Sequence, residues 1–122
     1  MKIIFDSNFL IDVARFRIDL DILNEICGKC EFTILSCVLS ELKEIAKSKG
    51  KNGTFAKLAL KNLKLKRFKI LKVKEKNTDN AILRVSDENT IVATNDKELR
   101  KKLKEKGVKT IYIRAKKKIV MG

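Results

Sequence analysis

The chain has 122 residues and a mass of 14.0 kDa, which is enough for one hydrophobic core and too little for two ordinary domains. Lysine and arginine number 29 against 15 aspartate and glutamate residues, so the formal net charge is +14 and the expected partner is a polyanion. No apolar run approaches the about 18 residues of a membrane span, and Asp6 and Asp12 interrupt the apolar N-terminus. The sequence therefore excludes a membrane span and argues against a cleaved signal.

Short β-like runs alternate with longer helical runs in the first half of the chain. The apolar residues 2–5 predict a strand, and a helix begins near Ser7 with its apolar residues on one side. Residues 19–27 predict a second helix, residues 31–35 a second strand, and residues 38–49 a third helix that ends at the glycine after it.

The same alternation continues in the second half. Helices are predicted at residues 54–66, from Thr78 or Asp79 onward, and at residues 96–106. Strands are predicted at residues 68–73, 90–94 and 109–113. Because the two kinds of element alternate, we expect a three-layer α/β/α domain in which helices cover both faces of a parallel sheet of about five strands. This domain would span residues 1–114, with residues 115–122 as a basic C-terminal tail.

Three cysteines and no histidine limit the chemistry of the chain. Cys27 and Cys30 have the spacing of half a zinc site, but the only other thiol, Cys37, lies beside a predicted strand, so zinc is the minor alternative to two reduced thiols at a turn. An odd cysteine count fits a reducing cytoplasm. Without histidine the usual neutral-pH general base is missing, which favours hydrolysis by a metal-activated water.

Four acidic residues occupy the places where apolar runs give way to helices. They are Asp6, Glu41, Asp79 and Asp96. The carboxyl ends of parallel strands line one crevice, so these carboxylates are expected to converge on a divalent metal. The alternative for the three aspartates is helix capping, and Asn95 with Glu98 has the spacing of a capping box. For Glu41 the alternative is an ordinary surface carboxylate.

Four motifs contain these acids in a characteristic order: IIFDSNFLID, VLSELKEI, TDNAIL and IVATNDKEL. The chain resembles the PIN domain, the PilT N-terminus fold of metal-dependent ribonucleases, from Lys2 to about Arg114. The stretch IVATNDKELRKKLKEKGVKTIYIR is most similar to archaeal PIN proteins and to the eukaryotic PIN nuclease of the small-subunit processome. It looks less like a typical VapC toxin.

The resemblance implies roles for the residues that match the motifs. The expected catalytic and metal-binding residues are Asp6, Glu41, Asp79 and Asp96. The expected accessory residues, which would support these acids or the waters on the metal, are Ser7, Asn8, Thr94, Asn95 and Glu98. The implied cofactor is Mg²⁺ or Mn²⁺, since hard cations prefer oxygen ligands. The expected reaction is in-line hydrolysis of RNA, which in the resembling family leaves a 5′-phosphate and a 3′-hydroxyl.

The basic residues gather in two segments. Residues 43–76 hold 13 lysines and arginines against two acids, and residues 97–118 hold 11 against two. Such clusters bind phosphates through counterion release, although for any single lysine a solvated helix face is the simpler explanation. The candidates for RNA binding are Lys64, Lys66, Arg67, Lys69, Arg100, Lys101 and Lys104.

The sequence therefore predicts a cytoplasmic, metal-dependent endoribonuclease that acts on structured RNA, with ribosomal RNA processing as the first candidate role. The alternatives are an RNA-binding scaffold in ribosome assembly and a toxin-type ribonuclease with an antitoxin. A response-regulator receiver is disfavoured by the spacing of the acids and by the +14 charge. Homodimerisation, a ribosome-assembly partner and an antitoxin all stay open as partner predictions.

Overall fold

The computed structural model describes residues 1–122. The strands are β1 (Lys2–Phe5), β2 (Glu31–Leu35), β3 (Lys69–Leu71), β4 (Thr90–Ala93), β5 (Lys109–Arg114) and β6 (Lys118–Met121). The helices are α1 (Ser7–Arg15), the 3₁₀ helix η1 (Leu20–Leu23), α2 (Asn24–Cys27), α3 (Ser36–Ala46), α4 (Lys51–Leu65), α5 (Thr78–Val85) and α6 (Lys97–Glu105). No helix is both long enough and apolar enough to cross a membrane.

One sheet contains all six strands in the order β3-β2-β1-β4-β5-β6. The first five are parallel, which confirms the predicted parallel sheet. From β1 the chain continues to β2 on one side, while β4 pairs with β1 on the other side. Because the order of strands reverses between β1 and β4, their carboxyl ends open a crevice at the point where open α/β sheets bind ligands.

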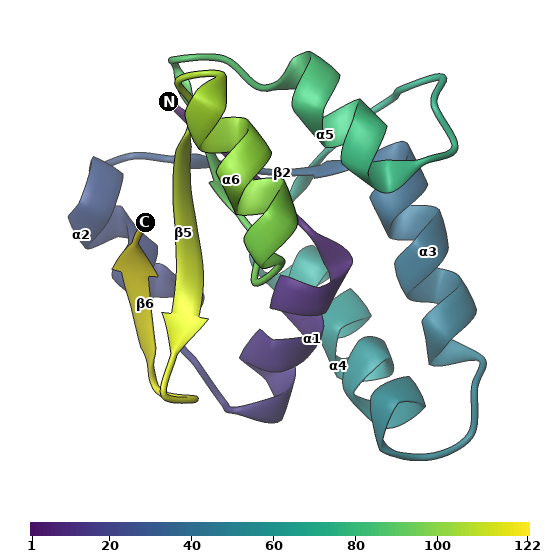
Figure 1. Cartoon of the computed structure of the whole chain (residues 1–122). Helices are drawn as coiled ribbons and strands as arrows, with labels where there is room; N and C mark the ends of the chain where they lie inside the picture. The colour runs from purple at the N-terminus through teal and green to yellow at the C-terminus, as the bar shows by residue number, and fades with distance from the viewer.

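Helices cover the sheet on both faces, as expected for three layers (Figure 1). On one side α1 packs on α4, which also packs on α3, and on the other side α5 packs on α6. The crossovers from β1 to β2 and from β4 to β5 run in opposite directions, and right-handed crossovers then place their helices on opposite faces. The two groups of helices meet where α3 contacts α5.

The core consists of 27 buried apolar residues, and the central strands contribute most of their length to it. Every residue of β4 is buried, as its uninterrupted apolar sequence predicts. The ring of Phe5, the last residue of β1, lies 4.9–5.8 Å from the rings of Phe9, Phe32 and Phe68. This aromatic cluster holds the carboxyl end of β1 rigidly against the helices that follow it.

The expected basic tail at residues 115–122 is wrong, because β6 pairs there with β5 in antiparallel register. Ala115 and Lys116 have φ of +54° and +59°, which turns the chain back after β5. Ile119 then packs against the core, and the Gly122 amide donates a hydrogen bond to the Thr110 carbonyl over 2.9 Å. The three lysines before Ile119 led to the prediction of a tail, but the short apolar run after them forms β6, which covers the edge of β5.

Two helix predictions also need correction. The helix expected at 19–27 is divided into η1 and α2. The helix expected at 38–49 ends at Ala46, and Gly50, expected to end it, instead precedes α4 with φ of +99°. Gly53 lies inside α4, where a Cβ atom would be 2.0 Å from the Ser48 carbonyl oxygen. The position needs glycine because of this close approach to the backbone at Ser48, and the helix is not broken there.

Cys27 and Cys30 lie side by side across the turn between α2 and β2, and their Cα atoms are 5.9 Å apart. That separation is within the usual range for disulfides, so the two thiols are close enough to be joined by oxidation. Their reduced state stays a prediction of the sequence. Cys37 is a free, half-buried thiol.

Candidate active site

Asp6 is a buried carboxylate immediately after β1, and both of its oxygens accept hydrogen bonds. Its backbone amide continues the sheet by donating to the Ala93 carbonyl over 2.9 Å. Oδ1 accepts from the Ser7 amide at 2.8 Å and Oδ2 accepts from the Thr94 hydroxyl at 2.9 Å. A helix cap needs only the first of these two bonds. The second bond fixes the carboxylate to the end of β4, so capping alone does not account for Asp6.

The electrostatic surroundings of Asp6 oppose its ionisation. Burial raises its pKa from 3.8 to about 6, and the negative charges of Asp79 and Glu41 add to the rise. The hydrogen bonds from Thr94 and Ser7 act in the opposite direction. Asp6 is only 5% exposed, so solvent does little to screen it. Burial is the main cause of the rise, and the smaller contributions of Asp79 and Glu41 indicate that three predicted acids, distant in sequence, lie near one another in space.

Glu41 lies in the second turn of α3 and faces the end of β1. The Ser7 hydroxyl donates a hydrogen bond to Glu41 Oε1, so Ser7 contacts Asp6 through its amide and Glu41 through its side chain. Glu41 itself is exposed, which keeps it accessible to a ligand. Ser7, predicted as an accessory residue, therefore connects two of the predicted acids directly.

Asp79 lies in the first turn of α5 and does not cap that helix. The cap is Asn77, whose side-chain oxygen accepts from the Asn80 amide at 2.9 Å, so the capping alternative is wrong for Asp79. Burial raises the pKa of the Asp79 carboxyl, the charges of Asp96 and Glu41 raise it further, and the charge of Lys102 acts in the opposite direction. No hydrogen bond contributes to this shift, which leaves the carboxylate available to a cation.

Asp96 follows β4 and caps α6, as the capping alternative expected. Its Oδ1 accepts from the Glu98 amide at 2.9 Å and from the Leu99 amide at 3.1 Å, while its own amide donates to the Thr94 hydroxyl at 3.2 Å. Both cap bonds use the same oxygen, so the cap does not require Oδ2. The Glu98 side chain, predicted as an accessory, is exposed on α6.

Asn95 does not support Asp96 through its side chain. Its amide nitrogen donates to Asp12 Oδ2 at 2.7 Å, and its side-chain oxygen accepts from the Ile113 amide at 2.9 Å. Asn95 therefore joins the loop after β4 to α1 and to β5. Its contribution is to hold this loop in place, and Thr94 is the residue beside it that touches the acids.

The acids suit a hard divalent cation by their chemistry, since every donor is oxygen. No three of these carboxylates lie close enough together to bind one ion directly. Mg²⁺ usually keeps several waters and takes only one or two carboxylates, so a smaller set of direct ligands is sufficient. Asp79, Oδ2 of Asp96 and Oε2 of Glu41 accept no hydrogen bond from the protein, and the repulsion within the group favours a bound cation.

A polar cleft of about 510 Å³ adjoins the acidic group on the side of α1 and α4. Its lining residues are Asn8, Ile11, Asp12, Arg15, Ile45, Asn52, Asn95 and Asp96. From the sequence we predicted three of these as site residues, Asn8, Asn95 and Asp96, and missed the other five. Asn8, Asp12 and Arg15 follow one another at intervals of four and three residues, so the polar face of α1 was the signal that could have identified two of them.

The residues predicted to bind RNA fall into two groups in space. One group lies around the end of α4 and the start of β3, away from the carboxyl ends of the strands. In this group the Lys66 ammonium is 2.9 Å from an Asp21 oxygen and the Lys69 ammonium is 3.3 Å from a Glu31 oxygen. Both cations already have acidic partners, which weakens their case as phosphate contacts.

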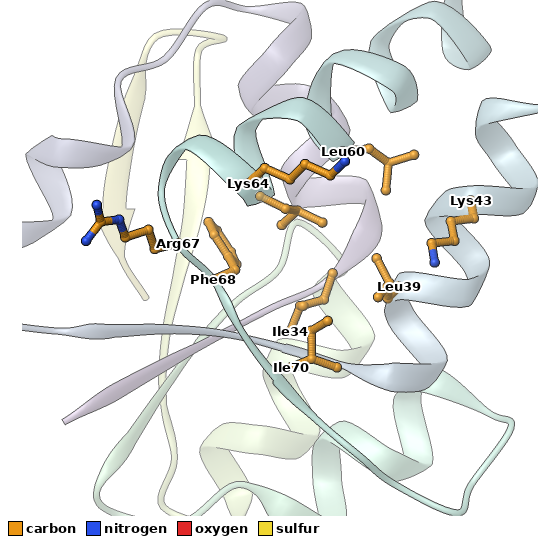
Figure 2. Close-up of a pocket in the computed structure, with 9 residues that line it drawn as sticks. Ile34, Leu39, Lys43, Leu60, Lys64, Arg67, Phe68 and Ile70 are labelled. Carbon is orange, nitrogen blue, oxygen red and sulfur yellow. The ribbon is translucent and has the colours of Figure 1, made fainter.

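Figure 2 shows the other two residues of this group, Lys64 and Arg67, at the border of a hollow of about 590 Å³. Six of its nine lining residues are apolar, among them Leu39, Leu60 and Ile70. The second group lies on α6, where Lys101 and Lys104 are exposed. There the Arg100 guanidinium carbon lies 4.1 Å from the centre of the Tyr112 ring.

The reversal of strand order between β1 and β4, with buried and half-buried acids at that point, defines a doubly wound α/β domain with an acidic centre. The chain belongs to the PIN-like domain family, whose model matches residues 3–116. It is 41% identical over 123 residues to Ribonuclease VapC4 of Methanocaldococcus jannaschii, covering 95% of this chain and 92% of that protein. The family predicted from the motifs is confirmed.

Two solved structures have a similar fold. The PIN domain endonuclease Utp24 matches with a TM-score of 0.80 and 26% identity, over 98% of this chain and 90% of that one. VapBC2 from Rickettsia felis, bound to a DNA fragment from their promoter, matches with a TM-score of 0.56 and 16% identity, over 93% and 100%. The last match shows the fold alone. The relative at 41% identity is an archaeal protein, as the motifs predicted, and it has a VapC name.

Proposed function

We propose that the protein is a divalent-metal-dependent endoribonuclease with its centre at Asp6, Glu41, Asp79 and Asp96. The observation that carries this proposal is the burial of Asp6 against two other acids, with its pKa raised to about 6. Holding the buried carboxylate of Asp6 near two other acids costs folding free energy, and perturbed carboxylates of this kind concentrate at functional sites. Similarity to a protein named as a ribonuclease supports the choice of reaction.

The acidic residues of the centre would bind the cation, and the basic surface around them would bind the RNA. When bound there, Mg²⁺ or Mn²⁺ would activate a water and polarise the phosphodiester. Thr94 and Ser7 fix the orientation of Asp6, so this carboxylate needs no rearrangement on binding. Asp79, which no hydrogen bond restrains, and Oδ2 of Asp96 are available to the cation directly or through the waters that it keeps. The net charge of +14 then draws the RNA backbone to the protein.

Paired variants on α3 test the proposal. Glu41 and Glu44 are exposed and one turn apart, but only Glu41 contacts the centre, whereas Glu44 pairs with Lys47 at 2.9 Å. The wild type, Asp6→Asn, Glu41→Gln and Glu44→Gln are compared on a structured ribosomal-type RNA with Mg²⁺, Mn²⁺ or EDTA. Cleavage is expected from the wild type and Glu44→Gln with metal, and from neither of the other two.

Cleavage that persists in EDTA, or in Asp6→Asn at the wild-type rate, would refute a metal-dependent centre. RNA binding without cleavage by any of the four proteins would instead favour the alternative of an RNA-binding scaffold. A circular dichroism spectrum of each variant shows whether the fold is kept.

Two biological roles are compatible with this activity. The similarity to VapC4 favours a toxin-type ribonuclease with an antitoxin partner, because it extends over 95% of the chain. The resemblance of the motifs to the PIN nuclease of the small-subunit processome favours cleavage of structured ribosomal RNA, and the similarity to the endonuclease Utp24 supports cleavage within a chain. Expression of the wild type and of Glu41→Gln in the same host separates them. Growth arrest by the wild type alone supports the toxin role, and normal growth together with cleavage of precursor ribosomal RNA supports the processing role.

A further inference from the structure

The cleft beside Asp96 combines a mostly polar lining with two apolar side chains. Ile11 of α1 and Ile45 of α3 both face it. Ile11 is only 6% exposed and Ile45 is half-buried, so both side chains are held in place by their packing. The volume of about 510 Å³ is within the range of roughly 300–1,000 Å³ typical of small-molecule sites. Such a cleft accommodates a flat heterocyclic ring better than a bare phosphate.

Two exposed amides provide hydrogen bonds at its border. Asn8 projects from α1 and Asn52 from the first turn of α4. Each amide offers two N–H donors and a carbonyl acceptor, which is the mixture that the edge of a nucleobase presents. Proteins read unpaired RNA bases through such edge contacts, combined with packing against the face of the base.

The charges in the cleft are arranged along α1. Asp12 is held by Asn95 at 2.7 Å and accepts N–H donors, whereas it repels phosphate. Arg15 lies three residues further along the helix and is exposed, with its guanidinium carbon 5.1 Å from the centre of the Phe16 ring. One end of the cleft therefore favours the amino groups of a base, and the other end favours a phosphate.

We propose that this cleft binds one unpaired nucleotide of the RNA next to the cleaved bond, with Asn8 and Asn52 at the base edge and Arg15 at a phosphate. Asp96 belongs both to the acidic centre and to the cleft, so the bound nucleotide adjoins the reacting phosphodiester. A paired base cannot present its Watson–Crick edge to the amides, so the cleft selects single-stranded positions. The proposal rests on the proposed ribonuclease function and adds the substrate feature that it recognises.

Binding measurements test the cleft separately from cleavage. All proteins contain Asp6→Asn, so that the RNA stays intact, and the probes are short unstructured oligoadenylate, oligocytidylate and oligouridylate in Mg²⁺ buffer. Asn52→Ala is matched with Asn24→Ala, since both side chains are exposed and only Asn52 lines the cleft. Arg15→Gln is matched in the same way with Arg17→Gln.

The two cleft variants, Asn52→Ala and Arg15→Gln, should change different properties of RNA binding. Loss of an amide hydrogen bond in Asn52→Ala is expected to weaken binding about threefold to tenfold and to change the order of preference among the three RNAs. Loss of a phosphate contact in Arg15→Gln is expected to reduce the slope of log affinity against log salt by about 0.7 for all three RNAs. Asn24→Ala and Arg17→Gln should keep both the preference and the slope of the parent.

Equal behaviour of each cleft variant and its matched control would overturn the proposal, as would a parent protein that binds none of the three RNAs. A ribonuclease with unaffected cleft variants would keep the proposed function and lose only the cleft. A protein that cuts no RNA, but whose cleft variants show the expected losses, would keep the cleft and lose the ribonuclease.

Discussion

The Thr94 hydroxyl donates to Asp6 Oδ2 at 2.9 Å across 88 positions of the sequence. The same hydroxyl accepts the amide of Asp96 at 3.2 Å. One threonine at the end of β4 therefore orients the acid that follows β1 and the acid that follows β4. Both acids keep their relative positions only while β1 and β4 remain paired, as they do through Phe5 and Ala93.

Replacing Thr94 with valine should impair cleavage without leaving a cavity in the core. The variant keeps the volume of the side chain but removes the donor that lowers the pKa of Asp6. Activity is expected to fall about tenfold to a hundredfold, and the acidic limb of the pH profile should move to higher pH. Thr110→Val is the control, because Thr110 is buried on the neighbouring strand and its hydroxyl has no partner. Cleavage by this control should be unchanged and its free energy of unfolding equal or higher.

The pKa of Asp6 predicts a pH dependence of stability in the metal-free protein. The pKa of Asp6 rises from 3.8 to about 6 on folding. Between these two pH values the Asp6 carboxyl is therefore protonated in the native state and ionised in the unfolded chain. Native binding of the proton means that the free energy of unfolding falls as pH rises from about 4 to 6, by about 3 kcal/mol from this group. Urea denaturation in EDTA measures it, as the difference between the wild type and Asp6→Asn. A constant difference across this pH range would contradict the raised pKa.

Divalent cations should stabilise the folded protein through the acidic centre. A cation that binds only the native state at a hundred times its dissociation constant adds about 2.7 kcal/mol. The melting temperature is therefore expected to rise with Mg²⁺ or Mn²⁺ in the wild type and in Glu44→Gln, and to stay constant in Asp6→Asn. A rise in all three proteins would place the binding elsewhere.

Gly53→Ala should destabilise the protein, although glycine to alanine inside a helix usually stabilises. The added Cβ would be 2.0 Å from the Ser48 carbonyl oxygen, which is a backbone atom, so the turn before α4 must shift. A loss of about 1–3 kcal/mol in the free energy of unfolding is expected, the usual cost of overpacking. Lys57→Ala, an exposed change one turn further along α4, should stay within about 0.5 kcal/mol. A more stable Gly53→Ala protein would show that this contact is not as tight as the structure places it.

The two groups of basic residues should differ in their effect on RNA binding. Lys101→Gln combined with Lys104→Gln is expected to reduce the salt slope for single-stranded RNA by about 1.4, or 0.7 for each cation. Lys64→Gln combined with Arg67→Gln should have a smaller effect, because these residues border the apolar hollow. The opposite order would show that the RNA passes over α4 instead of α6.

Local patterns of the sequence were sufficient to predict the strands of the parallel sheet and the family. The apolar run TIVA is buried along its whole length, and the alternation of strands and helices is enough to indicate a parallel sheet. The motifs also identified four acids, and each of them influences at least one of the others electrostatically in the structure. Local patterns failed where a short apolar run was surrounded by lysines, as in β6, and where Gly53 had a packing role.

The sequence by itself determined which residues form helices and strands and in what order the acidic motifs occur, because these depend on neighbours within a few positions. Only the tertiary structure decided the partners of those residues. The bond from Thr94 to Asp6, the bond from Asn95 to Asp12 and the presence of Asn52 in the same cleft all depend on the order of strands in the sheet. That order results from how the whole chain buries its apolar surface, and no local spacing of residues specifies it.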